Sequence, residues 1–404
     1  MEHGGDIYTN RGIELDFSVN LNPLGPPEQV RSALRNMLDL IACYPDPLCR
    51  ELRHALALKL GVPEAWILCG NGASEMLQAA VQAIKPTKVL IPVPTYQGYE
   101  RAARAAGAEV VFRQLERENG FRITDDILED IEALPEGSIL FVCNPNNPVG
   151  NCIREDLLQR IAEKCGKAGI YLIVDECYLE LVPGEEMRSM RRFLSTNPYL
   201  MIVRAFTKTY AMPGVRLGYL MASDEALRGK ISLQQPEWSV SMLAQCAGLA
   251  ALSMDRAAGV NERRGTDRGA DGAAEGESEK GAAGRASYLS DALKVIHDER
   301  AYVSQGLRDL GADVYDGEAG FVLFSCDRDL YEPFRESGVL IRRCDNLRGL
   351  ESAGSGQDNS RSGQECAESG QDNAGSGQHF YRIGLRKHSE NVRLLDRIQD
   401  LLSQ

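Results

Sequence analysis

The sequence lacks the features that would place it in several common classes of protein. No apolar run is long enough to cross a membrane, and the opening Met-Glu-His-Gly-Gly-Asp contains neither a basic segment nor an apolar stretch. We therefore expect no signal peptide and no membrane partner. Positive charge is also in deficit, because 58 Asp and Glu outweigh 45 Lys and Arg and give a net charge of −13. This excess of negative charge argues against nucleic acid as the main partner.

Paired cysteines are missing as well. The 11 cysteines are scattered without a Cys-x-x-Cys pair, which argues against a zinc site, and we expect no metal. Several of them, such as Cys143 and Cys177, stand in apolar runs, as small buried side chains do. This pattern predicts a reducing, cytoplasmic location.

What the chain does contain is an alternation of apolar runs with amphipathic segments over residues 50–252. The alternation predicts an α/β fold with a mostly parallel sheet that is covered by helices on both faces. A helix is expected over residues 28–41, before the alternation begins. The expected strands cover residues 88–92, 109–112, 138–143, 171–174 and 200–204.

The same pattern suggests a division into domains. Residues 1–30 form an expected N-terminal arm that packs with the small domain, residues 31–256 a large domain, and residues 286–404 a small C-terminal domain. The small domain should begin with a helix, continue with strands near residues 312–315, 321–324 and 380–385, and close with a helix from about residue 390.

Two segments do not fit this division. Residues 257–285 are rich in Gly, Ala, Glu and Arg, and residues 351–378 repeat Gly-Gln-Asp-Asn at 356 and 370. Neither has enough large apolar side chains to offset the loss of chain entropy, so both are predicted to be mobile or disordered inserts. The second insert lies between two candidate substrate arginines, and it could cover the site or lie outside it.

Lys208 is the first residue with potential chemistry. It stands eight residues before Arg216, which lies in a Pro-Gly-Val-Arg-Leu-Gly turn. A partly desolvated lysine can attack an aldehyde in its neutral form, and an arginine is a natural clamp for a phosphate. The alternative is a surface lysine near a tight turn.

Two upstream segments favour the chemical interpretation. The apolar Leu-Ile-Val run that ends in Asp175 predicts a buried strand with a carboxylate at its C-terminal end, where ligands gather in open α/β sheets. A buried aspartate needs a positive partner, and a protonated pyridine nitrogen would be one. A second run leads into Asn144-Pro-Asn-Asn147-Pro, and both Asn147 and Tyr178 could reach a cofactor's ring oxygen. The alternatives are a helix N-cap at Asp175 and an ordinary turn around Asn147.

Together these motifs resemble those of the fold-type I pyridoxal-phosphate enzymes, in the class I and II aminotransferase group. The resemblance covers nearly the whole chain apart from the two inserts. It implies a large domain with a mostly parallel seven-stranded sheet and a smaller α+β C-terminal domain. It also implies that Lys208 is the Schiff-base lysine, Asp175 the partner of the pyridine nitrogen and Arg216 a phosphate ligand. By the same resemblance, Asn147 and Tyr178 flank the ring oxygen.

Further cofactor contacts follow from the resemblance. The turn that leads through Gly72, Ala73 and Ser74 is similar to the family's phosphate cup, in which glycines let the backbone approach an anion and a helix aims its N–H groups at it. Tyr96 resembles the aromatic residue that stacks on the ring. Tyr44 resembles a tyrosine that reaches the phosphate of the neighbouring subunit, which implies a homodimer.

Two positions depart from the family pattern, and one of them, Val149 in place of the family's Thr, is expected to be tolerated. Ala205 stands three residues before Lys208, where the family usually has Ser or Thr that donates to the phosphate. One hydrogen bond is therefore expected to be missing, and Thr207 is expected to compensate in part.

The substrate is inferred from other residues. Arg382 resembles the arginine that grips a substrate carboxylate in two places, and Arg342 is a second candidate for an anion. A solvated charge at a strand end is the alternative for both, and for Arg386. The segments around His3, Asn20, Arg342 and Trp238 resemble the threonine-phosphate decarboxylases of cobalamin synthesis, which implies that His3, Asn20 and Arg342 surround a substrate phosphate.

This resemblance implies decarboxylation of L-threonine O-3-phosphate to (R)-1-aminopropan-2-ol O-2-phosphate, with pyridoxal 5'-phosphate as cofactor. The related histidinol-phosphate aminotransferases would use the same residues, and the choice depends on which bond at Cα lies perpendicular to the cofactor ring. A third possibility is a cofactor-binding regulator without catalysis. Lys208, and the lack of any recognisable DNA-binding segment, count against it.

Overall fold

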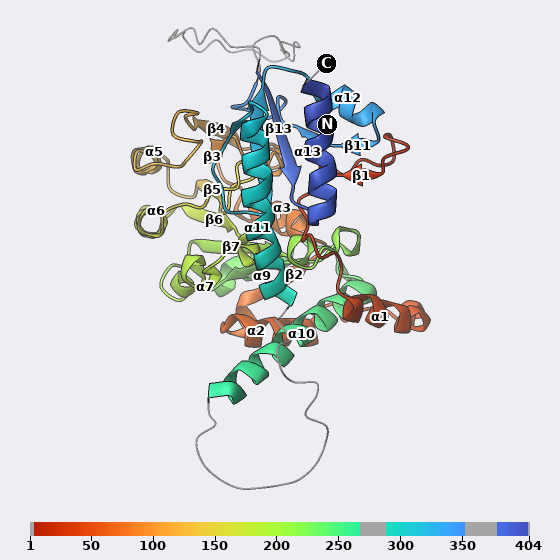
Figure 1. Cartoon of the computed structure of the whole chain (residues 1–404). Coiled ribbons are helices and arrows are strands. Elements are labelled where there is room, and N and C mark those ends of the chain that lie inside the picture. The colour runs from red at the N-terminus through yellow and green to blue at the C-terminus, as the bar shows by residue number, and fades with distance from the viewer. Residues whose placement is uncertain (1–3, 267–287, 352–377, 403–404) are drawn as a thin grey trace.

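The computed structural model describes residues 4–266, 288–351 and 378–402 (Figure 1). A seven-stranded sheet forms the centre, with the strand order β2-β8-β7-β6-β5-β3-β4. Neighbouring strands are parallel except at β8, which is antiparallel to both β7 and β2. The mostly parallel sheet is therefore confirmed. Its strands are β2 (Ile67–Gly70), β3 (Lys88–Val93), β4 (Glu109–Gln114), β5 (Ile139–Cys143), β6 (Tyr171–Asp175), β7 (Leu200–Ala205) and β8 (Gly218–Ala222).

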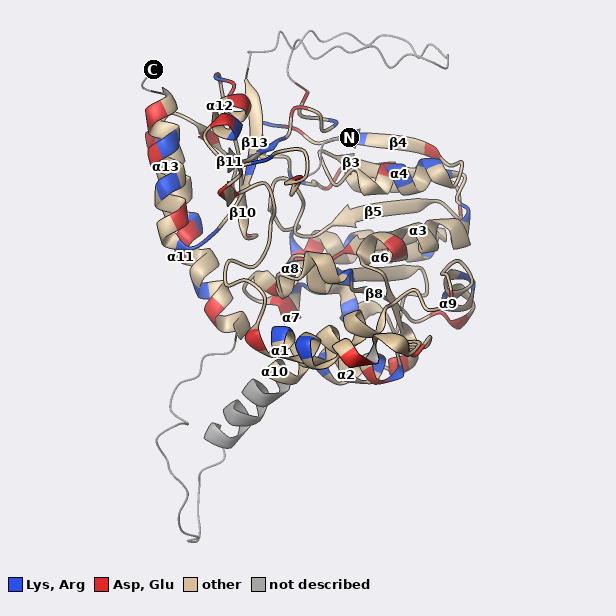
Figure 2. Ribbon diagram, turned by 90° about the vertical axis from the view of Figure 1, so that its right-hand side faces the viewer, with Lys and Arg blue, Asp and Glu red and all other residues tan. Residues whose placement is uncertain are grey.

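Helices cover both faces of this sheet, as Figure 2 shows from the side. On β6, Ile173 packs with α3 (Ala73–Ile84), α4 (Gly98–Ala105) and α9 (Glu225–Ser232) in one core. Its neighbours Leu172 and Val174 point the other way, into a core with α2 (Arg50–Leu60), α5 (Ile127–Glu132), α6 (Glu155–Ala168) and α10 (Met242–Thr266). Since both faces are buried, the central strands are apolar almost throughout.

The helix expected over residues 28–41 is divided into two elements, because α1 ends at Asn36 and a 3-10 helix follows. Other short elements connect the strands and helices of the large domain. The remaining elements of this part are α1 (Glu28–Asn36), η1 (Leu38–Ala42), η2 (Glu64–Trp66), η3 (Leu179–Leu181), α7 (Glu185–Arg188), η4 (Met190–Phe193), α8 (Phe206–Thr209) and η5 (Pro213–Val215).

The C-terminal domain is a second, smaller unit of α+β type. Its antiparallel sheet has the order β12-β13-β10-β9, formed by Arg342–Arg343, His379–Gly384, Phe321–Cys326 and Asp313–Val314. The helices α11 (Tyr288–Asp309) and α13 (His388–Leu402) lie side by side against it (Figure 1). A third helix, α12 (Tyr331–Glu336), packs beside β11 (Val339–Leu340).

The N-terminal arm connects the two domains and forms a two-stranded sheet of its own with β11. Its strand β1 (Leu15–Asp16) pairs in parallel with β11 of the C-terminal domain. A few residues later the Asn22 N–H donates to the carbonyl of Lys208 at 3.1 Å, and the Asn22 side chain donates to the carbonyl of Thr209 at 2.9 Å. The arm therefore runs from the small domain to the segment that carries the candidate catalytic lysine.

One expectation from the sequence is wrong in part. Helix α10 continues to Thr266, so residues 257–266 are helical, although a loop was expected from residue 257. The Ala-Ala and Glu-Arg-Arg groups in this stretch favour a helix and extend one that is already nucleated. Residues 267–285 and most of the second insert lie outside the described residues.

Candidate active site

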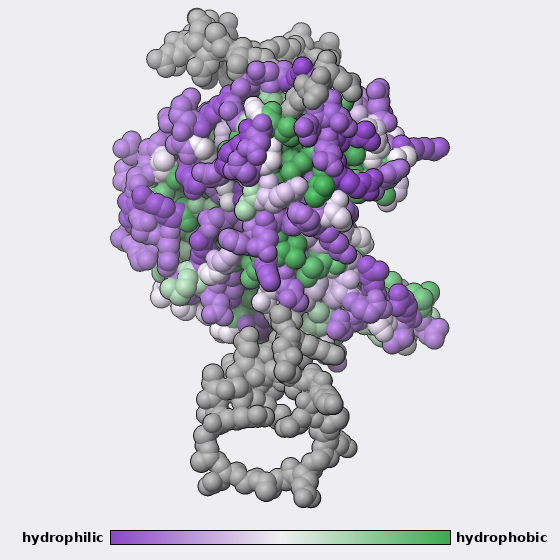
Figure 3. Space-filling model, in the orientation of Figure 1, coloured by the Kyte–Doolittle hydropathy of each residue, from purple (hydrophilic) through white to green (hydrophobic). Residues whose placement is uncertain are grey.

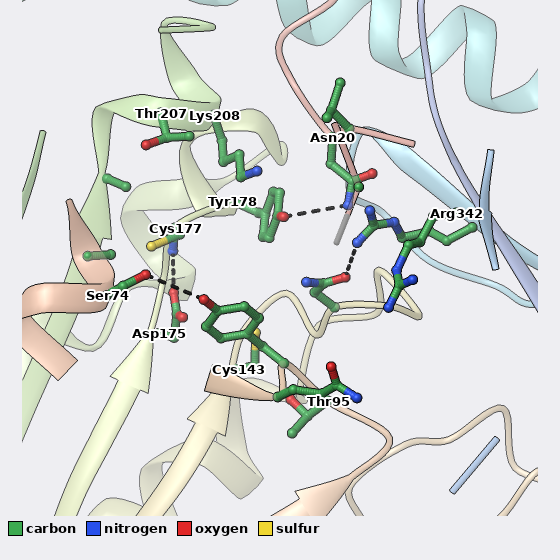
Figure 4. A pocket seen from close by; sticks show the side chains of 18 of the residues that line it. Asn20, Ser74, Thr95, Cys143, Asp175, Cys177, Tyr178, Thr207, Lys208 and Arg342 are labelled. Atoms are coloured by element: carbon green, nitrogen blue, oxygen red, sulfur yellow. Dashed lines mark hydrogen bonds between the residues drawn. The ribbon is translucent and has the colours of Figure 1, made fainter. Parts of the chain in front are cut away.

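The carboxyl ends of β5, β6 and β7 meet at one edge of the large sheet and face the small domain across a cavity. The cavity has a volume of about 510 Å³. Figure 4 shows side chains from the arm, the large domain and the small domain converging on it. The lining includes Asn20, Ala73, Ser74, Tyr96, Asn147, Asp175, Tyr178, Ala205, Thr207, Lys208, Arg216, Arg342 and Arg382.

Asp175 forms one wall of the cavity. It is the last residue of β6, and its side chain is buried. One carboxylate oxygen accepts the Cys177 N–H at 3.0 Å, and the other accepts the phenol of Tyr99 at 2.7 Å. No regular helix begins directly after Asp175, so the helix N-cap alternative is wrong. The carboxylate is held in one orientation that suits a cationic ring nitrogen.

Lys208 lies on α8, one short turn after β7 ends. Its ammonium nitrogen is 5.5 Å from the centre of the Tyr178 ring. Burial, together with the positive charges of Arg382 and Arg216, lowers the pKa of Lys208 to about 8. At pH 7 about a tenth of the amine is therefore neutral, far more than for an ordinary lysine, and the neutral form is the one that attacks an aldehyde. The surface-lysine alternative is wrong.

Glycines bring backbone and guanidinium together at the opposite end of the cavity. Gly72 has φ +85° and directly precedes α3, and a Cβ there would lie 2.4 Å from an Arg216 nitrogen. A Cβ on Gly218 would lie 2.4 Å from the backbone nitrogen of Ala73. Only residues without a side chain allow this approach. The result is a positively charged cup at a helix N-terminus, formed from the residues predicted to hold a phosphate.

Ala205 completes β7 beside this cup. It lines the cavity and offers no side-chain hydrogen bond at the start of α8. Thr207 also lines the cavity. Its role as a partial replacement for the missing hydroxyl stays a prediction.

Arg342 and Arg382 lie directly opposite each other on β12 and β13. Both side chains are buried, at 7% and 9% exposure, so the alternative of a solvated strand-end charge is wrong for both. Arg382 donates to Asn147 Oδ1 and to the Ser18 carbonyl, each at 2.6 Å, and Arg342 donates to Asn346 Oδ1 at 3.1 Å. Arg386 has a different place. It bonds Glu390 and the carbonyl of Asp16, and it is not among the residues that line the cavity.

Two buried polar atoms near this arginine pair lack a protein partner. They are Oδ1 of Asn20 and Nε of Arg382. The amide of Asn20 donates to the Tyr178 hydroxyl at 3.5 Å, so the arm reaches the cofactor side of the cavity. Buried polar groups are rarely left unpaired, and these two indicate a polar ligand.

Tyr96 approaches the cavity from the loop before α4. Its hydroxyl lies 3.4 Å from that of Ser74, and its ring meets the ring of Tyr99 edge-on at 5.4 Å. A Cβ on Gly98 would lie 2.2 Å from the Tyr96 ring, so a larger residue there would displace this ring.

Two predicted residues do not join the others. Tyr44 lies on the surface, 79% exposed, with its ring 4.9 Å from that of Trp238. It is not among the lining residues, and its predicted reach into a neighbouring subunit remains a prediction. His3 lies outside the described residues.

Several lining residues were not predicted as site residues. They are Gly4, Ser18, Val19, Leu77, Thr95, Gln97, Cys143, Cys177 and Leu347. Cys143 ends β5 and Cys177 follows Asp175, so their positions after strands were the only signal available. The arm residues could not be placed without knowing where the arm lies. Among the described residues, no group of His, Cys, Asp and Glu side chains could hold a metal ion, and no helix is long and apolar enough to span a membrane.

A sheet-edge cavity with a low-pKa lysine, an oriented aspartate and a glycine-lined anion cup defines an enzyme of the pyridoxal-phosphate-dependent fold-type I class. The family model for aminotransferase class I and II matches residues 13–348, and the chain belongs to this family. Pyridoxal phosphate is its cofactor. The cavity fits this group, because the cup, the amine and the carboxylate lie on different walls of one space.

The similar proteins include enzymes with two different activities. Threonine-phosphate decarboxylase of Salmonella typhimurium is 34% identical, over 99% of this chain and 96% of its own. Histidinol-phosphate aminotransferase of Symbiobacterium thermophilum is 32% identical, over 84% of this chain and 85% of its own. A solved structure of histidinol-phosphate aminotransferase from Clostridium acetobutylicum superposes with a TM-score of 0.76 at 25% identity, covering 96% of this chain and 99% of that one. The resemblance inferred from the motifs is confirmed.

Proposed function

We propose that the protein decarboxylates L-threonine O-3-phosphate to (R)-1-aminopropan-2-ol O-2-phosphate, for the linker of the cobalamin nucleotide loop. The similarity to threonine-phosphate decarboxylase over nearly the full length of both chains supports this substrate. In this proposal the protein's partner is a small phospho-amino acid, and the reaction involves neither a nucleic acid nor a membrane.

The buried pair of arginines is the observation that carries the proposal. Like charges directly opposite each other on neighbouring strands repel, and burial increases the repulsion. The burial of Arg382, and to a smaller extent the positive charge of Arg342, lower the pKa of Arg382. A ligand with two anionic groups relieves this repulsion, and a phospho-amino acid has both a carboxylate and a phosphate close together. We assign the carboxylate to Arg382, and the phosphate to Arg342 with Asn20.

When bound, pyridoxal phosphate would supply an electron sink for the bonds at the substrate's Cα. Asp175 would pair with the ring nitrogen and stabilise its positive charge. Arg382, which Asn147 and the Ser18 carbonyl hold in place, would fix the direction of the substrate carboxylate, and this direction would decide which bond at Cα breaks. Once carbon dioxide has left, Lys208 is the group placed to deliver a proton to Cα.

A second function, histidinol-phosphate aminotransferase, is favoured by the relatives that carry this name. In that reaction Lys208 would remove the proton from Cα, and a 2-oxo acid would be consumed. The same cavity residues would serve both reactions, so the product has to be identified.

We further propose a cytoplasmic homodimer. Ten cysteines in the described part of the chain are free, which suits a reducing compartment. Apolar side chains are exposed around Tyr44 and at the tip beyond α1, where Figure 3 shows a hydrophobic patch. They are Leu38 (55%), Ile41 (68%), Leu48 (51%) and Trp238 (44%). Such a surface is typical of an interface between subunits.

The test uses the purified protein loaded with pyridoxal phosphate. L-threonine O-3-phosphate is added without any 2-oxo acid, and carbon dioxide and the amine product are measured together. We expect one amine for each carbon dioxide, and no release with Lys208→Ala. Turnover of histidinol phosphate with 2-oxoglutarate, without release of carbon dioxide from threonine phosphate, would establish the aminotransferase instead.

A further inference from the structure

Tyr99 is not among the residues that line the cavity, but it contacts Asp175, the predicted partner of the cofactor's ring nitrogen. It is the second residue of α4, and its side chain is 1% exposed. Its hydroxyl donates to Asp175 Oδ2 at 2.7 Å. The remaining oxygen of Asp175 is held by a backbone N–H.

We propose that Tyr99 is a positioning residue for the cofactor, which acts through Asp175. With one oxygen fixed by backbone and the other by the phenol, the carboxylate cannot turn away from the ring nitrogen. An ionised carboxylate has about four acceptor sites, so these two donors leave room for the N–H of a pyridinium. The proposal concerns the cofactor and does not depend on which substrate the enzyme uses.

The surroundings of Tyr99 fix its ring independently of its hydroxyl. The ring stacks on Phe141 of β5, with centres 4.7 Å apart and planes at 10°. It also meets Tyr96, the residue predicted to stack on the cofactor, edge-on. Loss of the hydroxyl alone would therefore leave the packing intact, since a phenylalanine ring fills the same space.

The charges around the hydroxyl favour a donor. Burial and the negative charge of Asp175 raise the pKa of Tyr99 well above its usual value, as does the neighbouring Cys143. The pKa of the Cys143 thiol is also raised by burial and by Asp175. Both groups are therefore neutral across the working pH range, and the phenol keeps the proton that it donates.

Tyr99→Phe tests the proposal in the protein loaded with pyridoxal phosphate. A hydrogen bond to a charged group corresponds to about a tenfold change or more in an equilibrium constant. We expect the dissociation constant of the cofactor to rise by about tenfold. The pH at which its visible absorption changes should shift, and kcat should fall more than KM rises. The melting temperature of the cofactor-free protein reports whether the variant folds.

Tyr381→Phe is the matched control. Tyr381 is also fully buried, and its hydroxyl lies 3.1 Å from Asp329 Oδ1, outside the cavity lining. This variant should lose stability without changing the cofactor's absorption or its pH dependence. An equal spectral change in Tyr99→Phe and Tyr381→Phe would show that Tyr99 acts only through packing and would contradict the proposal.

A double-mutant cycle separates action through Asp175 from any direct effect. In an Asp175→Asn background, Tyr99→Phe should change the cofactor's dissociation constant and absorption far less than in the wild type. The proposal is overturned if the effect of Tyr99→Phe persists in full in that background, or if Tyr99→Phe alone leaves both properties unchanged.

Discussion

At the scale of single residues, the charge of Lys208 is set by its neighbours more than by its own chemistry. Its pKa of about 8 results first from burial and then from the positive charge of Arg382. In the cofactor-free protein, the rate at which pyridoxal phosphate attaches should therefore increase with pH and level off above about pH 8, because only the neutral amine attacks.

Arg382→Met should raise the pKa of Lys208. The pH at which the attachment rate reaches half its maximum should then move upward by up to about one unit. Stopped-flow absorbance across a pH series measures it. Arg386→Met is the control, because Arg386 bonds Glu390 and the arm outside the cavity lining. The electrostatic explanation fails if the midpoint does not move in Arg382→Met, or moves equally in the control.

At Ala205 a substitution should strengthen cofactor binding rather than weaken it. It is buried beside the phosphate cup at a position without a side-chain donor. Ala205→Ser should add one hydrogen bond to the cofactor phosphate and tighten its binding by about three- to tenfold. Equilibrium titration of the cofactor-free protein with pyridoxal phosphate measures this. An unchanged dissociation constant would mean that no phosphate oxygen is within reach of residue 205.

At the scale of elements, the phosphate cup depends on how closely β8 approaches the start of α3. Gly218→Ala would place a methyl group 2.4 Å from the Ala73 nitrogen and push the two elements apart. We expect a folded protein whose cofactor affinity falls more than tenfold, as judged by titration and by circular dichroism. Gly214→Ala is the matched control, because no atom lies within 4 Å of the position where its Cβ would be. Equal affinities in the two variants would contradict the close-approach argument.

The elements that the sequence predicted well are those with strong hydrophobic runs. Parallel strands buried on both faces are continuously apolar, so β3, β5, β6 and β7 could be recognised directly. Strand β2 has only four residues and leads directly into a glycine turn, and β8 begins directly after another such turn. Neither strand could therefore be recognised from its apolar run. The contact of Tyr99 with Asp175 could not be predicted, because 76 residues separate them and only the strand order brings them together.

The motifs of the candidate site were more informative than the helix boundaries. Lys208, Asp175 and Arg216 were recognisable because their spacing follows strand ends and a glycine turn. The first insert was predicted to begin at residue 257, although α10 continues to Thr266, since a composition rich in Ala, Glu and Arg suits a helix as well as a loop.

At the scale of the whole molecule, Tyr44 can reach a cofactor phosphate only across the interface of the proposed homodimer. Wild-type protein should sediment as a dimer, and Tyr44→Ala should weaken cofactor binding about tenfold through the loss of one hydrogen bond across the interface. Tyr8→Ala, which removes another exposed tyrosine from the arm, should have no such effect. Sedimentation velocity with cofactor titration measures both. A monomer that retains full affinity would contradict the predicted role of Tyr44.

The central claim is that the bond to the carboxylate breaks while the Cα–H bond survives. It is tested most directly with L-threonine O-3-phosphate carrying deuterium at Cα, in ordinary water. Decarboxylation predicts an aminopropanol phosphate that keeps its deuteron and gains one proton at the same carbon, as read by mass spectrometry and NMR. Loss of the deuteron, with formation of a 2-oxo product, would contradict the account and assign the cavity to transamination.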